Sequence, residues 1–236
     1  MNNDYQNYFP SADTASLSSR LSAIMRRVYV KMTLALIVTA FVAYFCSVSP
    51  AVTNFFVAHP ATLWVLVGAE LLIVIGVSAG INKISSGMAT LLFYLFAVVN
   101  GLMFFPLIMV FTGESIAKTF FITAGVFGAM SVYGYFTSRD LSRMGSILVM
   151  ALIGLIICSV VNIFMHSDTM GWIISGAGVL IFVGLTAWDT QQIKRMALQA
   201  PDEAVGKLAT IGALTLYLDF INLFLYLLRF FGQQRN

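Results

Sequence analysis

The sequence predicts an all-α integral membrane protein with seven transmembrane helices. Of its 236 residues, 59% are hydrophobic and only 10% are charged, whereas soluble domains contain about 45–50% apolar and about 25% charged residues. The apolar residues gather in seven windows with few charges. Each window has about the 20 residues that a helix needs to cross about 30 Å of hydrocarbon. These observations favour one helical membrane domain over soluble domains.

The first segment, residues 1–28, is predicted to be a polar cytoplasmic tail that ends in a short interfacial helix. Residues 1–16 are rich in Asn, Ser and Asp, a composition typical of disorder. From Leu17 to Val28, apolar residues recur at helical spacing between arginines, which indicates a helix lying in the membrane interface.

The transmembrane domain is predicted over residues 29–232, with a C-terminal tail at 233–236. Prolines, glycines and charged residues separate its windows. The spacing of Gly76 with Gly80 and of Gly125 with Gly128 predicts close helix packing. The predicted spans are 29–49, 61–81, 88–111, 116–137, 145–166, 170–192 and 208–231.

The distribution of Lys and Arg predicts a cytoplasmic N-terminus in the plasma (inner) membrane, because cytoplasmic loops carry an excess of these residues. With this orientation, ten of them lie on the cytoplasmic side and three on the other. The ten are Arg20, Arg26, Arg27, Lys31, Lys83, Arg139, Arg143, Lys194, Arg195 and Lys207, and the three are Lys118, Arg229 and Arg235. We expect the last span to cross fully, rather than to dip in and return.

Three carboxylates inside the apolar windows, Glu70, Asp189 and Asp219, are the candidate functional residues. A charge in hydrocarbon is costly, so such residues usually face a cavity or a partner. Polar residues share their helix faces: Thr186 with Asp189, and Thr215 and Asn222 with Asp219.

Asp189 and Asp219 lie on consecutive antiparallel spans, where they can meet just below the cytoplasmic surface. Two carboxylates in a low-dielectric bundle share a proton, which makes the pair a pH-sensitive joint. Both are also candidate ligands for a bound or permeant calcium ion. In the alternative interpretation, Lys194 or Arg195 neutralises a snorkelling Asp189. A purely structural role for Glu70, in which its protonated side chain forms a hydrogen bond to a neighbouring helix, is likewise left open.

Other chemistries find little support. The isolated Cys46, Cys158, His59 and His166 predict no zinc site or disulfide framework, and no cofactor is expected. No basic run with interleaved aromatics indicates nucleic-acid binding. An intramembrane aspartyl protease is an alternative, but its Gly-x-Gly-Asp run is replaced by Leu216-Tyr217-Leu218 before Asp219. We therefore expect no enzymatic activity, and the expected partners are the lipid bilayer, calcium and protons.

Two motifs closely resemble the Bax inhibitor-1 family, also called the transmembrane Bax-inhibitor-motif family, and its bacterial members in particular. They are Trp188-Asp189-Thr190-Gln191 and the segment from Leu216 to Phe224, supported by Ser138-Arg139-Asp140-Leu141-Ser142. The resemblance implies a central last helix wrapped by the other six. It also implies a pH-sensitive calcium leak channel, with Asp189 and Asp219 as the proton sensor.

The resemblance further places Glu70 where the family carries an acidic residue in the second helix. Some bacterial relatives also have an arginine at the inner end of this helix that latches onto an aspartate, whereas here the segment is Gly80-Ile81-Asn82-Lys83. As an alternative function, the resemblance implies a membrane interaction protein that modulates membrane-protein quality control or stress and cell-death factors. Its partner would be a membrane protease or another membrane protein, bound through residues 1–26.

Overall fold

A computed structural model describes residues 11–80 and 83–235 of the chain, and the side chains of residues 17–77, 80 and 83–235. This part of the chain folds into α-helices and one short 3-10 helix, and its only β-type pairing is an isolated bridge between Phe111 and Gln234. The predicted all-α fold is confirmed. The elements are α1 (Ser11–Ser47), α2 (Pro50–Ala58), α3 (Ala61–Gly80), α4 (Ser86–Val110), α5 (Gly113–Phe136), α6 (Ser142–Met165), α7 (Asp168–Gln199), η1 (Asp202–Ala204) and α8 (Val205–Phe231).

Each predicted span corresponds to one long helix. Among the described residues, six helices are long and apolar enough to cross a membrane alone, and α2 with α3, bent by 97°, makes up to seven. Three helices begin where a hydroxyl side chain caps a free backbone N–H, as expected of Ser and Thr. The capping residues are Ser85 for α4, Thr112 for α5 and Ser167 for α7.

The N-terminal region differs from the prediction of a separate interfacial helix. Residues 1–10 of the predicted tail lie outside the described residues, and α1 is continuous from Ser11 to Ser47. The apolar side chains of Ile24, Met25 and Val28 are buried in the bundle. Helix packing therefore accounts for the periodicity that suggested a helix lying on the membrane surface.

The prediction of close packing at two glycine pairs is wrong. A Cβ atom at Gly76, Gly125 or Gly128 would meet no other atom within 4 Å, and one at Gly80 would only touch Ile84 at 4.0 Å. Small-residue spacing identifies a thin helix face but does not say whether that face meets another helix.

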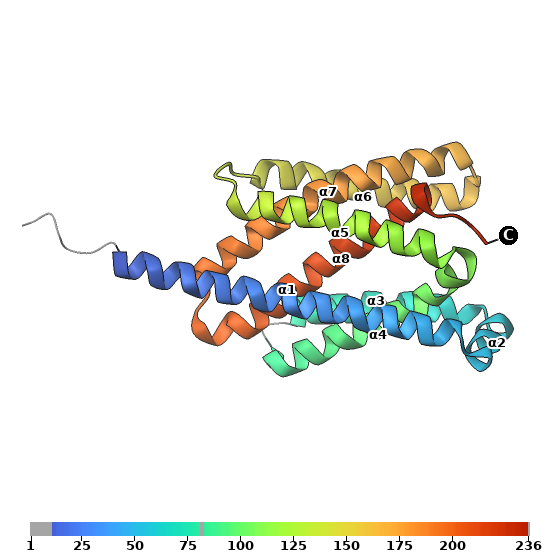
Figure 1. The fold of residues 1–236 in the computed structure, drawn as a ribbon, viewed down its shortest axis with the longest axis horizontal. Helices are drawn as coiled ribbons and strands as arrows, with labels where there is room; N and C mark the ends of the chain where they lie inside the picture. The colour runs from blue at the N-terminus through green and yellow to red at the C-terminus, as the bar shows by residue number, and fades with distance from the viewer. Residues whose placement is uncertain (1–10, 81–82, 236) are drawn as a thin grey trace, which may run out of the picture.

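The helices form two groups with α8 between them (Figure 1). Helices α1, α3 and α4 pack together on one side, and α5, α6 and α7 on the other; α8 packs against α1, α4, α5 and α7. In its most apolar window, 67% of the residues of α8 are buried, compared with 6% for α6. The predicted central position of the last helix is confirmed. Helix α3 packs on α4 and helix α6 packs on α7, so α3 and α6 form the outer layer.

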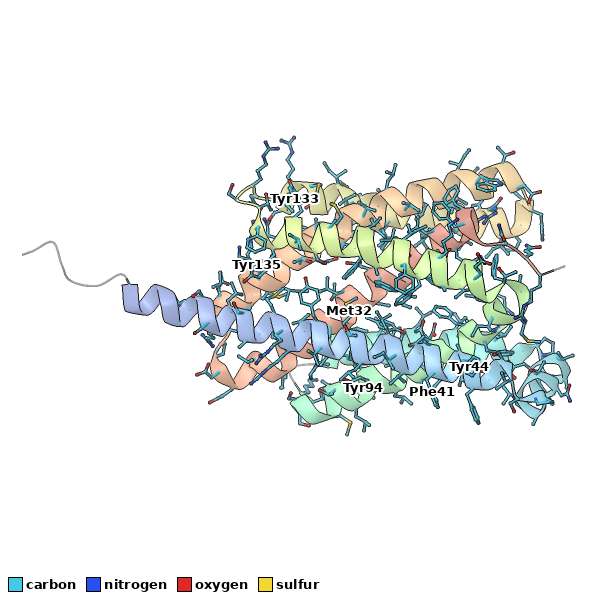
Figure 2. All side chains as sticks on the ribbon, viewed as in Figure 1. Met32, Phe41, Tyr44, Tyr94, Tyr133 and Tyr135 are labelled. Carbon is cyan, nitrogen blue, oxygen red and sulfur yellow. The ribbon has the colours of Figure 1, made fainter. Side chains whose placement is uncertain are left out.

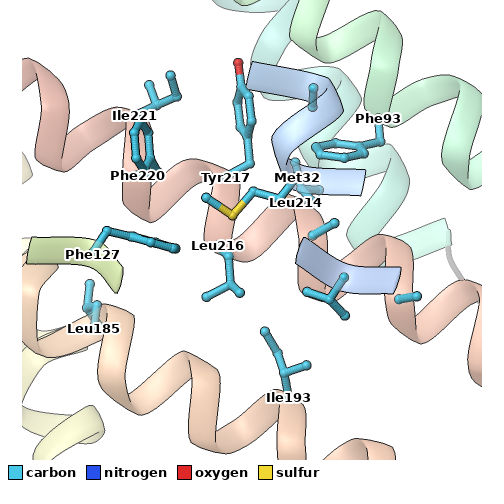
Figure 3. Packing of buried hydrophobic residues seen from close by; sticks show 14 of the residues in the cluster. Met32, Phe93, Phe127, Leu185, Ile193, Leu214, Leu216, Tyr217, Phe220 and Ile221 are labelled. Atoms are coloured by element: carbon cyan, nitrogen blue, oxygen red, sulfur yellow. The ribbon is translucent and has the colours of Figure 1, made fainter. Parts of the chain in front are cut away.

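The core is built around α8 from both groups. Leu216 of α8 points toward Ile193 of α7, whereas Tyr217 points toward α1 and α4, where Phe93 packs edge-on against its ring at 5.7 Å (Figure 3). Outward-facing side chains are apolar, as a lipid environment requires: on α1, Phe41 is 68% exposed, whereas Met32 is buried (Figure 2).

The last helix runs the full length of the bundle, as predicted. Near its start, Arg20 of α1 forms an ion pair with Asp202 at 2.8 Å. Beyond the end of α8, the carbonyl of Gln233 accepts a hydrogen bond at 2.8 Å from the N–H of Thr112, which lies in the loop between α4 and α5. Its 27 residues span about 40 Å at 1.5 Å per residue, enough to cross the hydrocarbon.

Candidate functional site

The structure brings Asp189 of α7 and Asp219 of α8 together. Their carboxyl groups lie close enough to interact with one another directly. Asp219 is only 4% exposed, on the central helix, and Asp189 is half-buried. The predicted meeting of two carboxylates from consecutive helices is therefore present in the structure.

This contact requires a proton. An ionised carboxylate can only accept hydrogen bonds, so a hydrogen bond between two carboxyl groups exists only while one of them is protonated. If both groups lost their protons, two like charges would face each other in a low-dielectric interior and repel. The pair can thus join α7 to α8 in one protonation state and separate them in another.

The two cations that could neutralise Asp189 are engaged elsewhere. Lys194 donates to the carbonyl of Tyr135 at 2.7 Å and lies 5.1 Å from the centre of that ring. Arg195 forms an ion pair with Asp140 at 2.5 Å. The structure therefore does not support the alternative of a snorkelling Asp189 paired with a helix-end cation.

Buried polar atoms without a partner occur in Asp219 and in both sequence neighbours of Asp189. Among the described residues, five buried side-chain nitrogen and oxygen atoms lack a hydrogen bond, and three of them belong to Trp188, Thr190 and Asp219. The unpartnered atom of Asp219 is Oδ2. Each such atom costs about 1–3 kcal/mol of stability. Of these atoms, Asp219 Oδ2 belongs to the aspartate pair itself, and an unsatisfied buried carboxylate oxygen is typical of a functional site.

The polar residues predicted to support the pair bond mainly to their own helices. Thr186 donates to the carbonyl of Phe182 at 2.7 Å, and Asn222 to that of Leu218 at 2.8 Å. Thr215 is half-buried one turn before Asp219. In the part of the chain that the structure describes, no hydrogen bond joins these three side chains to the pair.

Glu70 does not join the aspartates. It lies on α3, which packs chiefly against α4, and its Oε1 atom is buried without a hydrogen-bond partner. Tyr217 of α8 faces α1 and α4, on the side of α8 opposite Asp219. Of the three predicted carboxylates, the structure brings together two.

The site offers two carboxylates to a cation. The described residues contain no group of three or more His, Cys, Asp or Glu side chains that could hold a metal ion. A resident calcium site needs about six to eight oxygen ligands. The two carboxylates of the pair alone do not supply that number of oxygen ligands.

Lys83 does not act as a latch. Its side chain is exposed and forms no ion pair in the part of the chain that the structure describes. Among the described residues, the C-terminal end of α3 thus has no cation paired with either aspartate.

Sequence reasoning missed a clamp next to the site. Gln191 accepts from the Leu141 N–H at 2.9 Å and donates to the Arg139 carbonyl at 2.8 Å. Arg195 adds hydrogen bonds to Ser142 and to Gln191. The loop between α5 and α6 is thereby fixed to α7 one turn or less from Asp189. The Gln191-Gln192 pair after an apolar span was the available signal.

It also missed a polar node at the start of the bundle. Lys31 of α1 donates to the hydroxyls of Thr90 on α4 and Thr210 on α8, both at 2.7 Å. The two hydroxyls lie 3.1 Å apart. The node joins three helices and occupies the side of α8 turned away from Asp219.

Comparison with known proteins agrees with this architecture. A family model described as "Inhibitor of apoptosis-promoting Bax1" matches residues 21–236. The chain is 46% identical over 231 residues to a protein of Escherichia coli (strain K12) named "Inner membrane protein YbhL", covering 96% of this chain and 99% of that protein. An uncharacterized protein of Rickettsia prowazekii is 45% identical over 92% of both chains, and one of Borreliella burgdorferi is 43% identical over 90% of this chain and 92% of its own.

Proposed function

Because this chain belongs to the Bax inhibitor-1 family, we propose that it is a multi-pass inner-membrane protein that leaks calcium ions under the control of the Asp189–Asp219 pair. The observation that carries the proposal is the close contact between the carboxyl groups of the buried Asp219 and the half-buried Asp189. It joins the central helix to α7 through one proton. The contact between α7 and α8 therefore depends on pH when the aspartate pair can exchange protons with the solvent.

The mechanism follows from the protonation states of the pair. While the proton is shared, α7 and α8 are held together and the path past Asp219 is closed. When both carboxylates are charged, they repel each other, and together they attract a divalent cation through hard oxygen ligands. Calcium flux is then expected to rise as the pH rises. In this proposal the N-terminus of the protein lies on the cytoplasmic side of the membrane.

The experiment is calcium uptake into liposomes that contain the purified protein, at mildly acidic and mildly alkaline pH. Asp219→Asn keeps the size and a hydrogen bond but cannot ionise, so its flux should be the same at both pH values. Asp140→Asn is the matched control, since Asp140 is a carboxylate outside the pair that lies exposed in a loop. It should keep the pH step.

Two results would refute the proposal. Wild-type protein might pass no calcium at either pH, or Asp219→Asn might keep the pH step of the wild type. The first outcome would favour a role as an interaction protein, tested by deleting residues 1–26 and measuring partner binding. The second would place the proton sensor elsewhere.

A further inference from the structure

A basic groove lies on α1 where the helix enters the apolar part of the bundle. It is lined by Arg26, Arg27, Val30 and Lys31 and has a volume of about 300 Å³. Arg26 and Arg27 are exposed, and Lys31 is half-buried. Three positive side chains therefore surround the groove within two turns of one helix, and their apolar stems form its walls.

No carboxylate among the described residues neutralises these charges. The ion pairs of this part of the chain are Arg20 with Asp202 and Arg195 with Asp140. Arg27 and Lys31 are one turn apart and repel each other electrostatically. A site that gathers unpaired like charges is stabilised by an anion.

Lys31 makes this a fixed site rather than a set of mobile surface charges. Its ammonium group is held by the hydroxyls of Thr90 and Thr210, each at 2.7 Å. Both contacts are with neutral hydroxyls, so they do not neutralise the ammonium group, and one of its three N–H donors is left for another acceptor. A phosphate group there would meet one immobilised cation and two flexible arginines.

An apolar track continues from the groove along the same face of α1. Val30, Leu34, Ile37 and Phe41 follow at intervals of four, three and four residues, and their side chains are 51%, 48%, 57% and 68% exposed. A basic site that leads directly into an apolar track matches a molecule with a phosphate head and hydrocarbon chains. Free phosphate has no hydrocarbon chain that could pack against the apolar track.

We propose that this groove binds the phosphate of an anionic phospholipid, with the acyl chains of the lipid lying along the exposed face of α1. Basic pockets beside transmembrane helices bind such head groups in the cytoplasmic leaflet, the side on which we expect the N-terminus. Because Lys31 also contacts Thr210, the bound lipid would strengthen the contact of α1 with the central helix. The proposal is independent of calcium transport.

The test uses the full chain, purified and delipidated in a neutral detergent, and titrated with phosphatidylglycerol in native mass spectrometry. The variant is Arg26→Gln/Arg27→Gln. The matched control is Arg139→Gln/Arg143→Gln, which removes two exposed arginines at the same end of the bundle. Phosphatidylcholine and inorganic phosphate are the other probes.

We expect Arg26→Gln/Arg27→Gln to bind phosphatidylglycerol about 25-fold more weakly, about fivefold for each arginine. The control should bind it as the wild type does, phosphatidylcholine should bind weakly to all three proteins, and millimolar inorganic phosphate should not displace the lipid. Equal losses in the two double variants would show a general charge effect and overturn the proposal. So would unchanged binding in Arg26→Gln/Arg27→Gln, or displacement of the lipid by inorganic phosphate, which would indicate a site for free anions.

Discussion

Gly134 of α5 lies directly against the backbone of Ala187 in α7, so closely that a Cβ atom at position 134 would collide with the Ala187 carbonyl oxygen. Ala187 is two residues before Asp189. A very close approach of the α5 and α7 backbones is thus found near Asp189, and it depends on a glycine. This contact helps to set the position of α7 relative to the rest of the bundle.

We predict that Gly134→Ala destabilises the protein by about 1–3 kcal/mol, the usual cost of overpacking a tight contact. The obstacle is a backbone atom, which cannot rotate out of the way. Thermal unfolding in detergent measures the effect. Gly128→Ala on the same helix is the control, because a Cβ atom there meets nothing within 4 Å; equal losses of stability in the two variants would contradict the prediction.

The contrast between these glycines shows what the sequence could and could not predict. Apolar length was enough to predict the helices, because it follows from the solvent around them. The central position of α8 was predicted only by the family resemblance. Small-residue spacing favoured Gly125 and Gly128, whereas the tight contact is at Gly134. Which face of a helix meets its neighbour depends on the rotation of both helices, and a single sequence does not specify that rotation.

The same limit applies to the candidate site. The depth of Asp219 in its window was sufficient to identify it, and its pairing with Asp189 was one of two interpretations left open. Glu70 was equally deep, yet its helix packs on the far side of α4. Lys31 was counted only as an orientation signal, because its partners Thr90 and Thr210 are far away in the sequence.

A second prediction concerns the hydrogen-bond chain that joins Tyr217 to α1. Thr39 donates its only hydroxyl proton to the carbonyl of Ala97 at 2.8 Å, so the Tyr217 hydroxyl must donate to Thr39, 2.6 Å away. Tyr217→Phe should cost about 0.5–1.5 kcal/mol, the net value of one hydrogen bond. Thr39→Val should cost more, about 1–3 kcal/mol, because it leaves a fully buried tyrosine hydroxyl without a partner.

Unfolding of both variants under the same detergent conditions tests this order. If Tyr217→Phe were the more destabilising change, the assigned direction of the hydrogen bond would be wrong.

A third prediction concerns pH and the loop between α5 and α6. The hydrogen bond from the Arg195 guanidinium, helped by the backbone and side chain of Ser142, holds the pKa of the Asp140 carboxyl below its usual range. A lowered folded-state pKa stabilises the fold above the unfolded-state pKa of about 4, and this contribution is lost as the pH falls through the folded-state value. Asp140→Asn should therefore be less stable than the wild type at neutral pH, and the difference should shrink as the pH falls below about 4.

Melting temperatures of the wild type and Asp140→Asn across this acid range provide the measurement. A difference between the two proteins that stays constant with pH would show that the Asp140 charge does not act through Arg195.

The last prediction tests the clamp that Gln191 makes beside the aspartate pair. Gln191→Leu removes the acceptor of the buried Leu141 N–H and the donor to the Arg139 carbonyl. It should destabilise the protein by about 1–3 kcal/mol, because a buried backbone donor loses its partner. Gln191→Glu keeps an acceptor for Leu141 and adds a charge beside Arg195, so only the bond to the Arg139 carbonyl is lost, and we expect an intermediate effect.

The readout is hydrogen exchange of the Leu141 amide together with thermal unfolding. In Gln191→Leu this amide should exchange faster than in the wild type, while in Gln191→Glu it should stay protected. Gln192→Leu, one position along the same helix, controls for the general effect of an apolar substitution at this end of α7. Equal exchange of the Leu141 amide in Gln191→Leu and Gln192→Leu would mean that the loop is held to α7 by the Arg195–Asp140 ion pair rather than by Gln191.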